Sequence, residues 1–142
     1  MKLTSNKRGA FTLLEIMLVV TIIALLLGSA IFAMKDNLII AQDTRIKGDL
    51  QSIQTCLLTY QAGNGFLPTT EQGLNALVTR PDSDPRPRQW RQAFQKVPRD
   101  PFDQEYKYVQ PGTHNPDGYD LYSIGKDRKD STADDVGNWE SK

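Results

Sequence analysis

An uninterrupted apolar run near the N-terminus constrains this chain more than any other feature of its sequence. From Ile16 to Met34 there is no charged residue. At 1.5 Å per helical residue such a run spans about 28 Å, close to the thickness of bilayer hydrocarbon. Two cations, Lys7 and Arg8, precede the run, so the positive-inside rule predicts a cytoplasmic N-terminus. The sequence therefore predicts a membrane-spanning helix over about residues 11–34 and disfavours a uniformly soluble enzyme.

A secretory signal peptide is the simplest alternative, with Gly28-Ser29-Ala30 as a small-residue cleavage site. Two features count against it, because the apolar run is longer than an ordinary signal-peptide core and Glu15 stands at its edge. A carboxylate within a membrane segment costs roughly 2.5–3.5 kcal/mol on insertion scales, and less near an interface. A carboxylate in this place is therefore expected to have a partner or to reach the headgroups.

Glu15 has no cationic side chain to pair with later in the apolar run. Cleavage between Ala10 and Phe11 would create a new α-amine four residues before it. In a fibre the amine of one subunit can meet the carboxylate of its neighbour, so that proteolysis itself creates an assembly contact. A Glu15 side chain that extends only to the headgroup level is the alternative.

This N-terminal segment resembles the class III signal of type IV pilin-like proteins. A basic leader, Phe11, Glu15 four residues later and an apolar helix all coincide. In that family a prepilin peptidase cuts directly before the Phe and methylates the new amine. The resemblance implies a leader peptide of residues 1–10, with cleavage and N-methylation at the Ala10–Phe11 bond. The family usually has Gly before the cut, where this chain has Ala10.

The helical pattern continues beyond the membrane run. Five residues recur at spacings of four and three and form one apolar stripe: Ile46, Leu50, Ile53, Leu57 and Tyr60. No proline interrupts residues 11–62, and Gly63-Asn64-Gly65 favours termination. One helix from Phe11 to about Ala62 is predicted. Its stripe needs cover, either from a sheet in the rest of the chain or from a dimeric coiled coil, which the short repeat disfavours.

The rest of the chain, residues 63–142, is predicted to form a loop-rich globular domain that contains all eight prolines. The pattern Thr69-Thr70-Glu71-Gln72 is typical of a capping box and predicts a short helix through about Val78. Alternating residues predict strands over 105–110 and 119–123, and 136–139 is a candidate for a third. The predicted fold class is α+β, a long N-terminal helix packed on a small antiparallel sheet.

Charge is balanced overall but divided along the chain. The 17 basic and 17 acidic residues cancel, which argues against a generally basic nucleic-acid-binding protein. Six basic residues lie between Arg80 and Arg99, against Asp82 and Asp84, whereas acids outnumber bases about two to one from Asp100 onward. Either a solvated surface or complementary faces between identical subunits accounts for this division.

Four aspartates crowd the stretch between Ile124 and Trp139, namely Asp127, Asp130, Asp134 and Asp135. A hard cation with oxygen ligands would relieve their mutual repulsion. Their spacing excludes an EF-hand. On this chemistry alone, a calcium site and a solvated acidic loop are both open.

Segments in order over nearly the whole chain resemble the major pseudopilins of the type II secretion system. They are residues 68–74, 98–101, 119–125 and 134–139. The resemblance implies a subunit that polymerises into a periplasmic filament and drives export of folded proteins across the outer membrane. It further implies partners, namely prepilin peptidase, minor pseudopilins and an inner-membrane assembly platform.

The same resemblance implies one bound calcium ion. Its ligands would be the side chains of Asp127, Asp134 and Asp135, with backbone oxygens near Ile124 and Lys129. The family usually has Gly directly after the first of these acids, where this chain has Arg128-Lys129. Calcium in the family stabilises the subunit and permits fibre assembly.

Two other functions compete with a secretion filament. A type IV pilin for adhesion or motility commonly closes a C-terminal loop with a disulfide, which Cys56, the only cysteine, cannot form. A membrane-anchored calcium-binding module that never polymerises is the second. An enzyme is not predicted, because His114 is the only histidine and the sequence has no P-loop, dinucleotide fingerprint or evident nucleophile–base pair.

Overall fold

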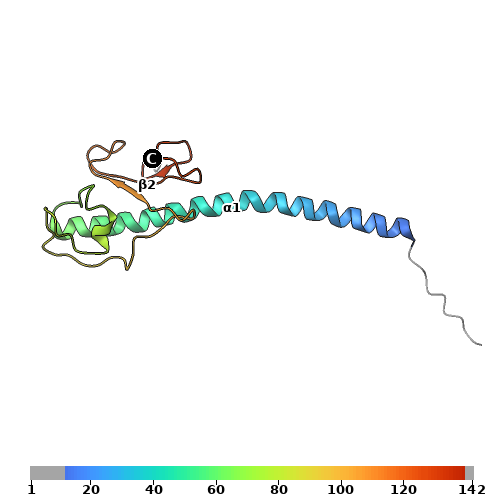
Figure 1. Ribbon diagram of the computed structural model, residues 1–142, viewed down its shortest axis with the longest axis horizontal. Helices are drawn as coiled ribbons and strands as arrows, with labels where there is room; N and C mark the ends of the chain where they lie inside the picture. The colour runs from blue at the N-terminus through green and yellow to red at the C-terminus, as the bar shows by residue number, and fades with distance from the viewer. Residues whose placement is uncertain (1–11, 140–142) are drawn as a thin grey trace, which may run out of the picture. The chain divides into compact units, whose positions relative to one another are not determined.

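The computed structural model describes residues 12–139, except for the side chains of residues 32–37. Helix α1 (Leu13–Asn64) is followed by the 3₁₀ helix η1 (Leu74–Leu77) and by strands β1 (Lys107–Val109), β2 (Asp120–Ser123) and β3 (Val136–Gly137) (Figure 1). The chain divides into two compact units between Ile40 and Ala41, so the second half of α1 belongs with the sheet. The fold class is α+β.

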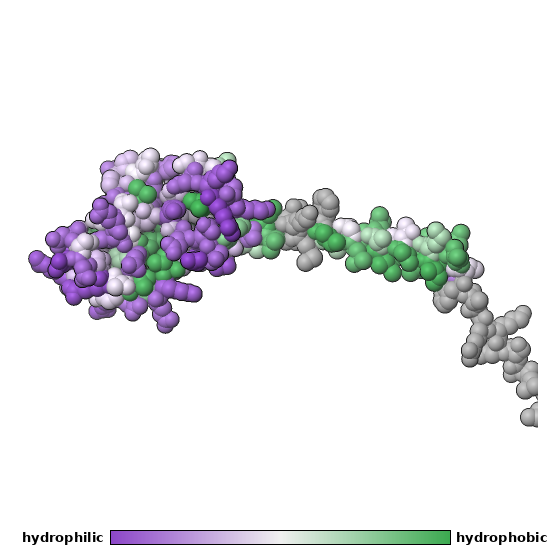
Figure 2. Space-filling view, viewed as in Figure 1, coloured by the Kyte–Doolittle hydropathy of each residue, from purple (hydrophilic) through white to green (hydrophobic). Residues whose placement is uncertain are grey.

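The first half of α1 is apolar on every side. Leu13–Ile31 is long and apolar enough to cross a membrane, judged by length and composition alone. Its large apolar side chains are all at least 47% exposed, and Figure 2 shows them as a hydrophobic surface. Within the first unit, no described part of the chain buries this surface.

The second half of α1 provides the core of the globular unit. All five residues of the predicted stripe, from Ile46 to Tyr60, are at most 6% exposed, which confirms the stripe. They pack against residues of η1, of the sheet and of the position just before β1: Leu74, Ala76, Leu77, Tyr106, Tyr108 and Leu121. The stripe is therefore covered within its own chain, and a coiled-coil partner is not needed for it.

The three strands form one antiparallel sheet in the order β1-β2-β3. Lys107 lies opposite Tyr122, and Ser123 lies opposite Val136. β1 is shorter than the predicted strand over 105–110. It ends at Val109, because the Gln110 N–H donates to Thr70 Oγ1 at 2.8 Å instead of extending the ladder.

The short helix predicted after the capping-box sequence is present, but it is a 3₁₀ helix. The box itself forms, since the Gln72 N–H donates to Thr69 Oγ1 and the Thr69 N–H donates to Gln72 Oε1, each at 3.2 Å. An α-helix does not follow, because Gly73 has φ +54 and breaks the turn. Only the four-residue 3₁₀ helix η1 follows. At the other end of the core, α1 ends at Asn64, and Gly65 follows with φ +81.

Candidate metal centre and assembly segment

Four oxygens of the predicted calcium-ligand set surround one hydroxyl group. Thr132 Oγ1 lies 2.6 Å from Asp134 Oδ1, 3.3 Å from Asp135 Oδ1 and 3.4 Å from Asp127 Oδ1. It also lies 3.2 Å from the backbone oxygen of Lys129. A hydroxyl has a single proton and donates to one acceptor at a time. The Thr132 proton can therefore satisfy only one of these four oxygens at a time.

The loop backbone holds the carboxylates in place through short turns. Asp127 Oδ1 accepts the N–H of Lys129 at 2.8 Å, and Asp135 Oδ2 accepts the N–H of Ser131 at 2.8 Å. Arg128 and Ser131 adopt positive φ values of 59° and 64° within these turns. The convergence of the aspartates is thus a product of the local sequence.

Ile124 anchors the start of the loop, because its side chain is buried in the globular unit. Gly125 follows with φ +66, and a Cβ there would collide with the backbone oxygen and the carboxylate of Asp134. The Asp127 N–H also donates to Asp134 Oδ2 at 3.1 Å. Glycine at position 125 therefore lets Asp134 lie directly against the backbone beside Ile124. The structure brings the predicted ligand residues into one neighbourhood.

Hydrogen bonds shape the acidity of the loop. The Thr132 hydroxyl and, after it, the Asp127 N–H hold the pKa of Asp134 below its ordinary value. A carboxylate that remains charged is the form that binds a cation. In the part of the chain that the structure describes, no three His, Cys, Asp or Glu side chains meet as a ready-made metal site, and the carboxylates meet the Thr132 hydroxyl instead.

The other charged residues of the loop point to different partners. Asp130 accepts a hydrogen bond from the Tyr122 hydroxyl at 2.9 Å and lies outside the Thr132 cluster. Burial and this contact with Asp130 raise the pKa of Tyr122 to about 12. Arg128 donates to the backbone oxygen of Phe102 at 3.3 Å. Among the described residues, no ion pair joins Arg128 or Lys129 to the carboxylates, so the two cations do not neutralise the cluster.

Of the predicted assembly residues, Glu15 lies in the first turn of α1. Ala10 and Phe11, at the predicted cleavage bond, are outside the described residues. The Glu15 N–H donates to the backbone oxygen of Thr12 at 3.0 Å and to Thr12 Oγ1 at 3.3 Å. Thr12 therefore caps the helix, and Glu15 lies in the first turn, where the helix dipole favours a negative charge. The Thr-x-x-Glu spacing is the sequence feature that could have predicted this cap.

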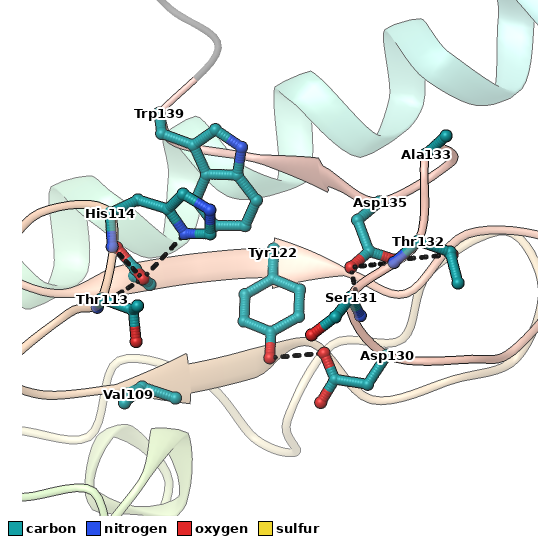
Figure 3. A pocket seen from close by; sticks show the side chains of 11 residues that line it. Val109, Thr113, His114, Tyr122, Asp130, Ser131, Thr132, Ala133, Asp135 and Trp139 are labelled. Carbon is teal, nitrogen blue, oxygen red and sulfur yellow. Dashed lines mark hydrogen bonds and ion pairs between the residues drawn. The ribbon is translucent and has the colours of Figure 1, made fainter.

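The sequence did not reveal a second polar cluster, which is centred on Asp120. Asp120 begins β2 and is buried, with its two oxygens accepting the N–H groups of Thr113, His114 and Asn115 at 2.7–3.0 Å. Burial alone would raise the pKa of Asp120, but these bonds and the His114 ring hold it below its ordinary value. His114 in turn stacks on Trp139, with ring centroids 3.9 Å apart (Figure 3). The lone histidine is therefore part of the structural support of the sheet.

A membrane-type apolar helix that continues into the core of a small antiparallel sheet defines a pilin-like subunit. Residues 34–139 match the family model described as "Type II secretion system (T2SS), protein G". Residues 5–31 match a second model, "Prokaryotic N-terminal methylation motif". The chain belongs to the type II secretion protein G family, the major pseudopilins, which are structural proteins.

Similar proteins support the same family over the whole length. Type II secretion system core protein G of Pseudomonas aeruginosa is 38% identical over 141 residues, covering 96% of this chain and 98% of the relative. The core protein G of Escherichia coli is 36% identical, covering 98% and 95%. The crystal structure of the major pseudopilin from the type 2 secretion system of enterohaemorrhagic Escherichia coli matches with a TM-score of 0.68 and 36% identity, covering 75% of this chain and 93% of that one. An adhesion or motility pilin and a non-polymerising module are not favoured.

Proposed function

We propose that this chain is the major building block of a type II secretion pseudopilus, a periplasmic filament that drives the export of folded proteins across the outer membrane. The observation that carries the proposal is the match to core protein G relatives over nearly the full length of both chains. The exposed apolar half of α1 supports it, because a surface of this kind needs lipid or other helices around it.

The precursor would be held in the inner membrane by Leu13–Ile31. Its basic leader carries Lys2, Lys7 and Arg8 and no acid, which supports a cytoplasmic N-terminus and a periplasmic globular domain. The match to the N-terminal methylation motif supports processing by a prepilin peptidase. Cleavage between Ala10 and Phe11 and methylation of the new amine would produce the mature subunit.

Assembly would follow from that cleavage. The new amine of one subunit would pair with the Glu15 carboxylate of its neighbour. Within one chain, this carboxylate makes no ion pair with any residue that the structure describes. Once extracted from lipid, the apolar helices would pack against one another in the filament core. Minor pseudopilins and the inner-membrane assembly platform would be the further partners of this step.

Calcium fits the acidic loop as a structural ion. The carboxylates of Asp127, Asp134 and Asp135 and the Lys129 backbone oxygen already lie within 3.4 Å of Thr132 Oγ1, and oxygen is the donor type that Ca²⁺ prefers. A backbone oxygen near Ile124 would complete the set. When bound, the ion would supply the positive charge that one hydroxyl proton cannot. It would thereby hold the C-terminal loop, which no disulfide closes.

Intact-mass and N-terminal analysis of the protein extracted from membranes tests the proposed processing. We expect a mature chain that begins at Phe11 and carries one added methyl group. An unprocessed chain, or a chain cut near Ala30, would contradict a pseudopilin maturation pathway and favour a simple anchor or a signal peptide.

A further inference from the structure

The face of the sheet that is turned away from the core carries a groove. Side chains alternate along a strand, so Tyr108 and Leu121 face the core while Val109 and Tyr122 face the opposite side. The loop at Thr113 and His114 borders this face on one side, and the acidic loop borders it on the other (Figure 3). Together they enclose about 560 Å³.

The lining of the groove combines aromatic rings with a carboxylate. The Tyr122 ring lies in the middle of the groove, with Trp139 beside it at 5.3 Å between ring centroids. The Tyr122 hydroxyl donates to Asp130 at 2.9 Å, which places a carboxylate at the end of the phenol ring. A planar guanidinium can stack on an aromatic ring while it pairs with a carboxylate, and arginine suits such a site better than lysine.

Asp130 has no cationic partner among the described residues. Lys107 is the nearest base by register, because it lies opposite Tyr122 in the sheet, yet it makes no ion pair with Asp130. Arg128 and Lys129 precede Asp130 directly, and Arg128 bonds to the Phe102 backbone instead. The Asp130 carboxylate therefore stays available for a cation from elsewhere.

The same domain carries unpaired arginines in a different place. Arg88 and Arg91 are exposed and form no ion pair within the part of the chain that the structure describes. Their segment is fixed to the end of α1 and to η1, since the Gln89 N–H donates to Asn64 Oδ1 at 2.9 Å and Trp90 Nε1 donates to the Ala76 backbone oxygen at 2.8 Å. In Figure 1 this segment and β2 lie on opposite sides of α1. A copy therefore cannot fill its own groove.

We propose that the groove over Tyr122 and Asp130 receives Arg88 of a second copy of this chain. Because donor and acceptor lie on different faces, the contact is head-to-tail and can be repeated from copy to copy, which is the geometry of an open helical filament. This inference rests on the proposed filament function and adds a contact between globular domains to the packing of the apolar helices. It also assigns a role to the division between basic and acidic segments.

Disulfide trapping between two tagged full-length chains tests the contact. Both chains carry Cys56→Ser; one adds Ala133→Cys at the groove and the other adds Arg86→Cys near Arg88. Under oxidation in membranes with an active secretion system, we expect a mixed disulfide between the tags. Asp130→Arg in the first chain should reduce this product at least fivefold, and Arg88→Glu in the second chain should restore it. Asp117→Arg, at an exposed carboxylate outside the groove, should leave it unchanged.

Arg88→Glu by itself is the variant that keeps the test valid if Asp130→Arg disturbs the acidic loop. It should reduce the product as strongly as Asp130→Arg does. Filaments that sediment normally without the mixed disulfide, or with a disulfide indifferent to both charge changes, would overturn the groove contact alone. Absence of both the sedimenting filament and the disulfide in the unsubstituted background would overturn the proposed function as well.

Discussion

The two halves of helix α1 differ in how their apolar side chains are buried, although they belong to one continuous element. In the first half, Leu25, Leu26 and Leu27 are 59–75% exposed, whereas in the second half Ile53 and Leu57 are completely buried. Within its own unit the described first half has no cover, whereas the second half is covered by η1 and the sheet. The length of a helix alone therefore does not reveal what covers it. The distribution of apolar residues around the helix does reveal it, since an all-round apolar surface indicates lipid or other copies and a single stripe indicates the domain's own core.

The largest expected effect on domain stability comes from the buried stripe. Leu57→Ala should lower the free energy of unfolding by about 2–5 kcal/mol, because it leaves a cavity where the side chain was fully enclosed. Denaturant unfolding of the full chain in detergent measures this. The matched control is Leu58→Ala, one residue later on the exposed side, which should change stability by no more than about 0.5 kcal/mol. An equal loss at both positions would mean that another copy covers the exposed side.

Removal of calcium should have the next largest effect and should be confined to the globular half. A site held at one hundred times its dissociation constant adds about 2.7 kcal/mol to stability, so a chelator should lower the melting temperature of the full chain clearly. Asp134→Asn should abolish the response, because Asp134 lies in the Thr132 cluster. Asp130→Asn should retain it, because Asp130 bonds to Tyr122 instead. A melting temperature that does not change when the chelator is added would contradict a calcium site.

A smaller effect is expected from the buried Asp120 as pH falls. Its pKa is lowered in the folded protein, so its contribution to stability is present above the unfolded pKa and is lost as pH falls through the folded value, below about pH 4. Asp120→Asn should lower the free energy of unfolding by about 1–3 kcal/mol near neutral pH. It should also make the loss of stability at acid pH less steep. Melting curves from pH 7 down to pH 3 measure both. If the loss of stability at acid pH is as steep in the variant as in the parent chain, other titrating groups cause it.

Regular periodicity made most of the fold predictable. The stripe from Ile46 to Tyr60, the sheet and its three strands follow from patterns of period 3.6 and 2. The type of the short helix and the exact end of β1 depended on single backbone positions. Gly73 with φ +54 turned the helix expected after Thr69 into a 3₁₀ turn, and the Gln110 bond to Thr70 shortened β1. Neither contact has a periodic signature.

The candidate sites divide in the same way. The aspartates of the acidic loop were visible as a cluster in the sequence, but their common contact with Thr132 depends on turns that only the folded loop defines. The support of the sheet by His114 joins it to Asp120 at the end of the same loop and to Trp139, which lies much further along the sequence. The Ala10–Phe11 bond and the calcium ligands remain predictions that biochemical measurement has to test.

The most direct measurement is filament sedimentation of a chain whose Glu15 has been replaced by Gln. Mass analysis first establishes that the variant is processed and methylated like the parent chain, and a melt establishes that its globular unit is intact. The account then predicts loss of sedimenting filaments, since the amine made by cleavage has no carboxylate to meet. Polymerisation at the parental level by this correctly processed variant would contradict the claim that maturation creates the contact between copies.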